Sequence, residues 1–130
     1  EVKNTRSQKK RCRKFIHRRI FNIGMETHED ERRTLIEWIK DEPFRSAKVV
    51  IAKGEQELGK HFHKNKDEAF LLLSGLAKRV KIGDVEEFNV QSPRKWVALR
   101  GVPHTFVLEK GAILLGVGSE PFDPNDEIPI

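Results

Sequence analysis

Two histidines and a glutamate near the middle of the chain have the residue types and the spacing of a metal site. His61 and His63 are two residues apart, so on a β-strand their imidazoles point to one face, while Phe62 points to the other. Glu68 follows five residues after His63, across the polar segment 64–67, and is placed to bring a carboxylate from the next strand. Two imidazoles and one carboxylate form a facial triad, a ligand set for a divalent transition metal.

A fourth ligand is predicted at His104, which follows the turn Gly101-Val102-Pro103 and begins an apolar segment. The resulting set of His61, His63, Glu68 and His104 suits Zn, Fe, Ni or Mn, and the residues alone do not select one of them. The same histidines serve as acid–base groups if no metal binds. The isolated His17 and His28 are interpreted as structural or solvated residues.

Short β-type segments, separated by turn residues, must position these side chains. They cover residues 35–39, 47–53, 60–63, 69–74, 78–82, 86–90, 96–99, 104–108 and 113–117. Gly83-Asp84 lies between two of them, as a tight hairpin turn should. A polar loop is expected over 26–33, with a possible short helical turn near 31–40, and a surface turn over 121–126. Eight or nine short strands with this punctuation predict an all-β antiparallel sandwich or barrel.

The histidine-rich segment resembles a known family. Residues 61–75 fit the first cupin motif, HxHx4Ex6G, through His61, His63, Glu68 and Gly75, and Gly101 with His104 is similar to the core of the second motif. The resemblance covers roughly residues 45–118. It implies a cupin-type double-stranded β-helix, a jelly-roll barrel of the cupin-2 type, within a single domain over 25–130. It also implies one divalent metal ion held by the four candidate ligands.

Two further segments look like the sugar-nucleotide epimerase and ketoisomerase branch of the cupins. They are DERRTLIE at 30–37 and SEPFDP at 119–124. This similarity implies a nucleotide-linked keto sugar as substrate, in polysaccharide biosynthesis, with proton transfer next to its carbonyl by His61, His63 or His104. The 3,5-epimerases of that branch pair a histidine base with a tyrosine acid, and this chain contains no tyrosine. A ketoisomerase-like or generic metal-dependent sugar enzyme is therefore preferred.

Two other classes of function remain open on the same ligand set. The first is an Fe(II)-dependent oxygenase acting on a small molecule, because two or three histidines and a carboxylate also suit iron with oxygen. The second is a non-catalytic barrel that binds a small ligand. A pocket lined by Phe70, Leu72 and Phe106 would suit all three, so whether the protein is an enzyme stays undecided at this point.

The net charge of +5 is concentrated at the N-terminus. Residues 1–24 carry nine of the 25 Lys and Arg residues but one of the 20 acids, so residues 25–130 have a net charge of −3. This distribution indicates a basic N-terminal arm rather than a basic folded face, so nucleic acid is not the expected partner. An edge strand over 15–21 within the arm would favour a homodimer. Lys64 and Lys66 are interpreted as solvated residues at a loop tip.

Apolar segments and the cysteine count indicate the cellular compartment of the protein. No stretch approaches 18 apolar residues, so no membrane span is predicted. The basic N-terminus is not followed by the apolar region of a secretory signal. The single Cys12 cannot form an internal disulfide, which fits a reducing environment. A cytoplasmic location is expected.

Overall fold

The computed structural model describes residues 24–40 and 43–130, so the predicted basic arm and its edge strand over 15–21 lie outside the described residues. The described part is almost entirely β-structure. Its elements are β1 (Glu26–Glu29), β2 (Thr34–Glu37), β3 (Ser46–Ile51), β4 (Gln56–His63), β5 (Glu68–Ser74), β6 (Leu76–Ile82), β7 (Val85–Gln91), β8 (Arg94–Ala98), β9 (His104–Leu108), β10 (Ile113–Gly118), the 3₁₀ helix η1 (Pro124–Asp126) and β11 (Glu127–Pro129).

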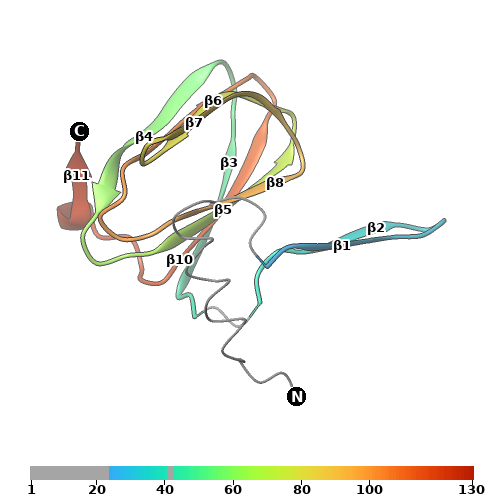
Figure 1. Ribbon diagram of the computed structural model, residues 1–130, viewed down its shortest axis with the longest axis horizontal. Coiled ribbons are helices and arrows are strands. Elements are labelled where there is room, and N and C mark those ends of the chain that lie inside the picture. The colour runs from blue at the N-terminus through green and yellow to red at the C-terminus, as the bar shows by residue number, and fades with distance from the viewer. Residues whose placement is uncertain (1–23, 41–42) are drawn as a thin grey trace.

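Two facing antiparallel sheets form the body of the molecule (Figure 1). One has the strand order β3-β10-β5-β8, and the other has the order β11-β4-β9-β6-β7. Except for the hairpin β6–β7, strands that are neighbours in these two sheets are not consecutive in the sequence, as in a jelly roll. The predicted all-β jelly-roll barrel is therefore confirmed, and each of the nine predicted segments overlaps one of the strands β2 to β10.

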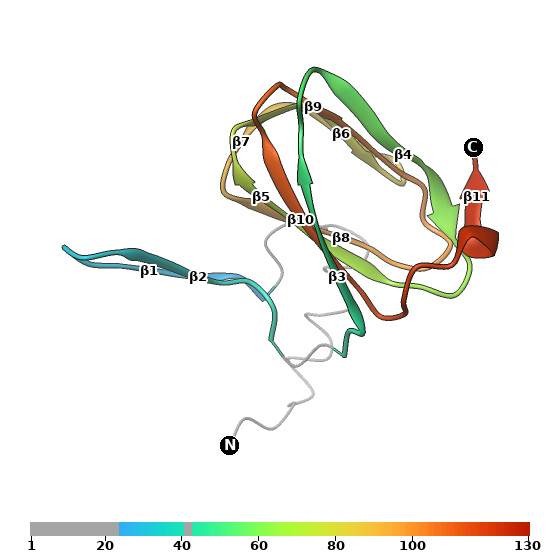
Figure 2. The ribbon, with the colours of Figure 1, turned by 180° about the vertical axis from the view of Figure 1, so that it is seen from behind.

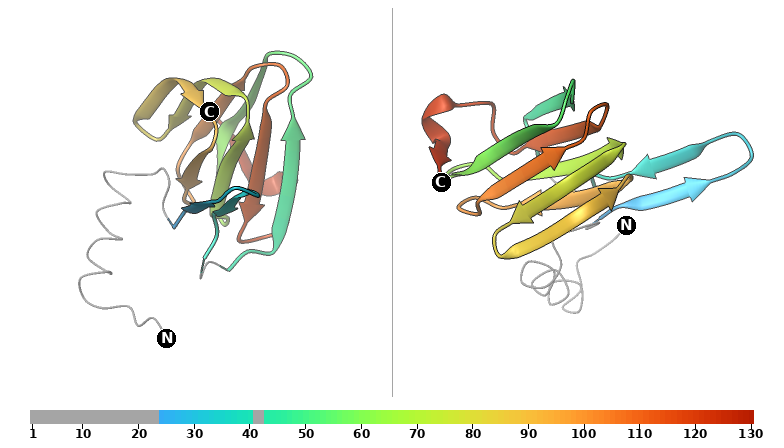
Figure 3. Two further views of the ribbon diagram at one scale, coloured as in Figure 1. Left: turned by 90° about the vertical axis from the view of Figure 1, so that its right-hand side faces the viewer. Right: turned by 90° about the horizontal axis from the view of Figure 1, so that it is seen from above.

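Strands β1 and β2 form a separate hairpin that extends away from the barrel (Figure 3). The polar loop expected over 26–33 and the helical turn near 31–40 are therefore wrong. The Asp30 carboxylate closes the turn by accepting hydrogen bonds from the backbone N–H groups of Arg32 and Arg33, at 2.8 and 3.1 Å. The chain then returns to the barrel at Trp38, whose carbonyl accepts a hydrogen bond from the buried Lys95 ammonium at 2.6 Å.

Alternate residues of the strands fill the space between the two sheets. The largest buried side chains of this core include Phe70, Leu72, Trp96, Phe106 and Leu108, each no more than 4% exposed. Full burial of such a side chain stabilises the fold by about 1.5–3 kcal/mol. Packing against this core fixes the register of the strands, and through it the positions of polar side chains farther along the same strands.

The turn between β6 and β7 has the predicted form. Ile82 pairs with Val85, which leaves Gly83 and Asp84 as a two-residue connection. Gly83 has a φ of 58°, a left-handed conformation that glycine adopts without steric cost. Within residues 24–40 and 43–130, no helix has the length and apolar character needed to cross a membrane.

Candidate metal centre

A bulge in β4 directs the first two candidate ligands into the barrel. The register between β4 and β9 shifts between Gly59 and His61, which leaves Lys60 as the extra residue. Gly59 and Lys60 both have left-handed φ values, of 82° and 62°. A Cβ atom at Gly59 would lie 2.6 Å from the His104 carbonyl oxygen, so glycine permits the close approach of β4 to β9. After the bulge, the rings of His61 and His63 lie on one face, 4.7 Å apart, as the alternation predicted.

The four candidate ligands converge although they come from three strands. His61 and His63 lie near the end of β4, Glu68 begins β5 and His104 begins β9. One ligand atom from each residue lies within 4.8 Å of the other three. Ions such as Zn²⁺ bind such atoms at about 2.0–2.2 Å, so a small contraction of the side chains would bring all four into one coordination shell.

Buried polar atoms at the centre of the cluster have no hydrogen bond to satisfy them. His63 Nε2 lies 2.8 Å from Glu68 Oε1, and His104 Nε2 lies 3.3 Å from the same oxygen. Neither His63 Nε2 nor Glu68 Oε1 is in hydrogen-bonding geometry. A buried polar atom without a partner costs about 1–3 kcal/mol. Imidazole nitrogens and a carboxylate oxygen directed at one point are the donors that fit a divalent transition metal.

Burial keeps the two β4 histidines neutral. It lowers the pKa of His61, and the neighbouring His104 and His63 rings lower it further. The pKa of His63 is also lowered by burial, which outweighs the opposite effect of the Glu68 carboxylate. Both imidazoles are therefore neutral at pH 7, the form in which histidine binds a metal or accepts a proton.

Glu68 is held in its ionised form. Burial alone would raise the pKa of this carboxyl group, but the adjacent His104 ring and the ammonium groups of Lys48 and Lys66 lower it to about 2. The two ammonium groups lie 3.5 and 4.0 Å from Glu68 Oε2. The interpretation of Lys66 as a solvated loop residue is wrong, because its side chain is 6% exposed. Lys64, in contrast, is exposed as expected.

The loop before β9 orients His104. His104 Nδ1 lies 3.3 Å from the Val102 carbonyl oxygen, a contact that favours a proton on Nδ1 and a free lone pair on Nε2. The Gly101 N–H donates to the His63 carbonyl oxygen at 2.6 Å, which ties this loop to the end of β4. The second motif is therefore joined to the first through its backbone as well as through the ligand cluster.

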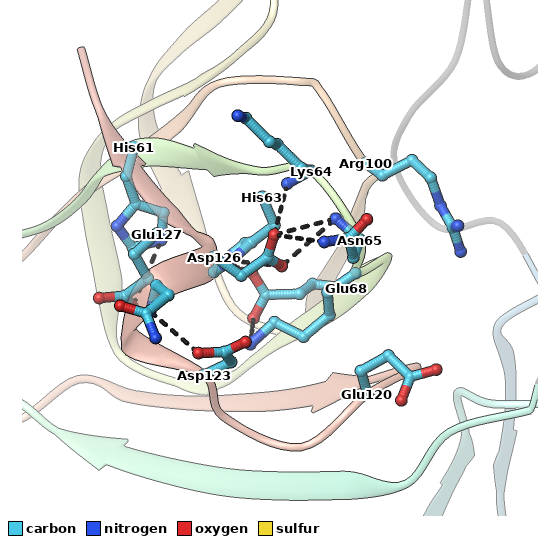
Figure 4. A network of polar contacts seen from close by, with 12 residues as sticks. His61, His63, Lys64, Asn65, Glu68, Arg100, Glu120, Asp123, Asp126 and Glu127 are labelled. Atoms are coloured by element: carbon cyan, nitrogen blue, oxygen red, sulfur yellow. Dashed lines mark hydrogen bonds and ion pairs between the residues drawn. The ribbon is translucent and has the colours of Figure 1, made fainter.

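The C-terminal segment adds two acids that the sequence interpretation missed (Figure 4). The buried Asp126 accepts hydrogen bonds through Oδ1 from the backbone N–H groups of Lys64 and Asn65, at 3.0 and 3.1 Å. Its Oδ2 lies 3.7 Å from His63 Nδ1. Glu127 Oε1 lies 3.9 Å from His61 Nε2. Asp126 therefore lies beside the ring nitrogen of His63 that is not the one close to Glu68, and Glu127 lies beside His61.

Local signals for this segment were present in the sequence. Asp123 accepts a hydrogen bond from the Asn125 N–H and caps η1, and Pro124 occupies the first turn, a common way to start a short helix. The predicted surface turn over 121–126 is exposed at residues 121–125, but it ends in the 3₁₀ turn η1, whose last residue, Asp126, is buried. After η1, strand β11 pairs with β4, with Glu127 opposite His63.

The predicted pocket residues Phe70, Leu72 and Phe106 lie in the buried core below the cluster. The Phe70 ring contacts both the His104 ring, at a centroid distance of 5.4 Å, and the Phe106 ring, at 4.8 Å. These side chains pack beneath the ligand cluster. That they also line a substrate pocket stays a prediction.

Fold and cluster together define a jelly-roll barrel with a histidine and carboxylate site at one end. The sequence matches the Polysaccharide biosynthesis C-terminal domain family over residues 28–105, and the chain belongs to this family. A comparison with curated proteins finds no match.

Solved structures with this fold include enzymes of sugar metabolism. The 4-keto-6-deoxy sugar epimerase NovW of Streptomyces spheroides is 17% identical, with a TM-score of 0.68, and the RmlC epimerase of Mycobacterium tuberculosis is 18% identical, with a TM-score of 0.69. Each match covers 82% of this chain and 66% of the other, so the chain spans slightly less than two thirds of these epimerases. The TDP-quinovose 3,4-ketoisomerase WlaRB of Campylobacter jejuni is 18% identical, with a TM-score of 0.72, and the match covers 85% of this chain and 91% of the ketoisomerase.

Proposed function

We propose that this protein is a metal-dependent isomerase or epimerase-like enzyme that acts on a nucleotide-linked keto sugar in polysaccharide biosynthesis. Membership of the polysaccharide biosynthesis family supports this class of pathway. The fold shared with sugar epimerases and a ketoisomerase supports the class of reaction. The observation that carries the proposal is the cluster of His61, His63, Glu68 and His104, in which the ring nitrogens of His63 and Oε1 of Glu68 are buried and lack hydrogen bonds.

The residues of the cluster divide into a buried and a more accessible part. Glu68, His63 and His104 are at most 4% exposed, whereas the His61 side chain is 18% exposed and contacts Glu127, which is 36% exposed. A divalent metal bound by the cluster would polarise the substrate carbonyl. With the metal bound, His61 is one of its ligands, so Glu127, whose side chain is 36% exposed beside His61, is the group placed to take a proton from the carbon next to that carbonyl and to return it. If no metal binds, the neutral His61 imidazole would be the base instead.

Metal binding is tested by elemental analysis of the protein purified without chelator. We expect about one metal ion per chain in the wild type and none in the His61→Ala, His104→Ala double variant, which lacks two of the four ligands. His28→Ala is the matched control, because His28 lies in the projecting hairpin with 67% of its side chain exposed. Wild-type protein that stays free of metal after reconstitution with Zn, Fe, Ni and Mn would contradict the metal centre.

The reaction is tested with a nucleotide-linked 4-keto-6-deoxy sugar in deuterated water. We expect NMR to show deuterium at a carbon next to the carbonyl, followed by the isomerised or epimerised product. The His61→Ala, His104→Ala variant should show neither. Iron in the purified protein together with oxygen consumption would instead indicate the oxygenase, and binding without exchange would indicate a non-catalytic barrel.

We also propose that the enzyme is cytoplasmic and acts as a homodimer. Support for the dimer comes from the β3-β10-β5-β8 sheet, in which β3 is an edge strand (Figure 2). Val49 and Ile51 on β3 have exposed fractions of 62 and 63%. Leu73 on β5 is 43% exposed on the same face. Large apolar side chains gathered on one sheet face are typical of a protein–protein contact.

A further inference from the structure

Two lysines approach the same oxygen of Glu68, but they differ in their access to solvent. Lys48 Nζ on β3 lies 3.5 Å from Glu68 Oε2, and Lys66 Nζ lies 4.0 Å from it. The Lys48 side chain is 53% exposed and the Lys66 side chain 6%. Lys66 therefore places a buried positive charge near Glu68. Lys48 lies near the same carboxylate but is accessible to solvent.

Two glycines of β10 make room for these lysines. Gly116 is paired with Lys48, and a Cβ atom at Gly116 would lie 3.0 Å from Lys48 Cε. A Cβ atom at Gly118 would lie 3.0 Å from Lys66 Cδ. Gly116 and Gly118 are two residues apart and thus share one face of the strand. The aliphatic parts of the two lysine side chains therefore pass over β10 where a larger residue would place its own side chain. This path brings both ammonium groups near Glu68.

Lys48 supplies a chemical property that the candidate ligands lack. The candidate ligands are three imidazoles and one carboxylate, and none of them is an ammonium group. Proton removal next to a carbonyl places negative charge on the carbonyl oxygen, and a positioned donor or cation stabilises that charge. A phenolic donor is excluded, because the chain has no tyrosine.

The nearby arginines are already engaged with acids at the rim. Arg45 forms an ion pair with Glu120 at 2.8 Å, and Arg100 binds the Asp67 carboxylate through its backbone N–H and its guanidinium group. The contact of Lys48 with Glu68, at 3.5 Å, is longer than a hydrogen bond between charged groups. The Lys48 ammonium can therefore turn to a substrate without breaking a close ion pair.

We propose that Lys48 is a catalytic residue whose ammonium group donates a hydrogen bond to the keto oxygen of the substrate and stabilises the enolate. This inference rests on the proposed function. The base takes the proton from the carbon next to the carbonyl, the C–H electron pair forms a C=C bond, and the carbonyl electron pair moves to the oxygen beside Lys48. Return of a proton to carbon restores the carbonyl, so no oxidant or reductant is needed.

The first test compares turnover of the nucleotide-linked keto sugar by Lys48→Met and Lys66→Met. Loss of one oxyanion donor lowers kcat by about 10²–10³-fold, and we expect this loss in Lys48→Met with a smaller change in KM. Lys48→Arg should recover part of kcat, because it keeps a cationic donor. Lys81→Met, at an exposed position on β6, is the control for the loss of a lysine. Equal losses of kcat in Lys48→Met and Lys66→Met would overturn the proposal, because both lysines would then act only through the charge of Glu68.

A second test does not depend on the sugar reaction. Oxalate is a planar dianion that resembles an enediolate, and its affinity for the metal-loaded protein is measured by isothermal titration calorimetry. We expect oxalate to bind the wild type and to bind Lys48→Met at least about tenfold more weakly, the loss of one charge-assisted hydrogen bond. If oxalate binding depends on Lys48 but the wild type does not turn over the keto sugar, the proposed reaction is contradicted. The role of Lys48 in binding an oxyanion is still supported in that case. Equal oxalate affinity in the two proteins, or none in the wild type, would overturn that role.

Discussion

Asp126 shows how one residue far along the chain supports the candidate ligands. It is 7% exposed and accepts hydrogen bonds from two consecutive backbone N–H groups, those of Lys64 and Asn65, directly after His63. The Asn65 side-chain amide also donates to Asp126 Oδ1, at 3.2 Å. The carboxylate therefore fixes the chain between the second histidine of the first motif and Glu68.

We predict that Asp126→Ala destabilises the protein and weakens metal binding. The two N–H groups are partly buried, and loss of each hydrogen bond to the charged carboxylate costs about 1 kcal/mol or more. Loss of a group that supports a ligand typically lowers metal affinity by about 10–100-fold. Urea unfolding and competition with a metal chelator measure the two effects. Asp126→Asn is the control, because the amide oxygen still accepts hydrogen bonds and should retain most of the stability.

The ligands and their supporting residues differ in how far the sequence predicts them. His61, His63 and Glu68 could be predicted because strand alternation and one short turn determine their relation. Lys48, Lys66 and Asp126 could not be assigned to the site in this way. Their contacts depend on how β3, β10 and the C-terminal segment are arranged in the barrel. No short sequence pattern predicts that arrangement.

The β4 strand illustrates the same difference for whole elements. Its last four residues were predicted, but the bulge at Gly59 and Lys60 was not, since Gly59 is required by a contact with β9 rather than by a turn. The strands β2 to β10 were found because apolar residues alternate between turn signals. Strand β1 was missed because Glu26–Glu29 is polar and exposed along its whole length.

Two glycines with nearly the same backbone conformation allow the effect of the bulge to be measured. Gly59 and Gly101 have φ values of 82° and 81°, so alanine at either position incurs a similar backbone strain of about 1–2 kcal/mol. A Cβ atom at Gly101 meets no atom within 4 Å, whereas one at Gly59 would lie 2.6 Å from the His104 backbone oxygen. Only the substitution at Gly59 must push β4 and β9 apart.

We therefore predict that Gly59→Ala is the more destabilising of the two by about 1–3 kcal/mol, the usual cost of overpacking. It should also weaken metal binding, because the strands that move carry His61 and His104. Gly101→Ala should lower stability and leave metal affinity close to that of the wild type. Denaturant unfolding and metal titration of both variants check this, and equal effects of the two would contradict a steric role for the bulge.

At the scale of the whole molecule, the barrel could be predicted, and the parts outside it could be predicted only in part. The turn signals and the two histidine-containing motifs define a jelly roll without reference to distant contacts. In the hairpin β1–β2, which projects from the barrel (Figure 1), β2 was predicted, but β1 is polar along its whole length and gives no apolar periodicity. Strand β11 is short, and its pairing with β4 depends on the return of the C-terminus to the ligand cluster.

The outer face of the β3-β10-β5-β8 sheet leads to the last prediction. Val49 lies opposite Leu115 and Ile51 lies opposite Ile113, so apolar side chains continue from β3 to β10. Leu71, opposite Leu115 on β5, is already buried within the chain. Strand β3 is at the edge of its sheet. A second copy of the chain that covers this face would bury Val49 and Ile51, and each fully buried side chain of this size contributes about 1.5–3 kcal/mol.

We predict that the wild type sediments as a dimer and that the Val49→Lys, Ile51→Lys double variant sediments as a monomer, because two ammonium groups would be buried without partners at the contact. The control is Phe88→Lys on β7, in the other sheet, where the side chain is also 62% exposed. This control should leave the dimer intact if the β3 face is the contact. A dimer that survives the double lysine substitution would place the contact elsewhere, and dissociation by Phe88→Lys alone would move it to the opposite sheet.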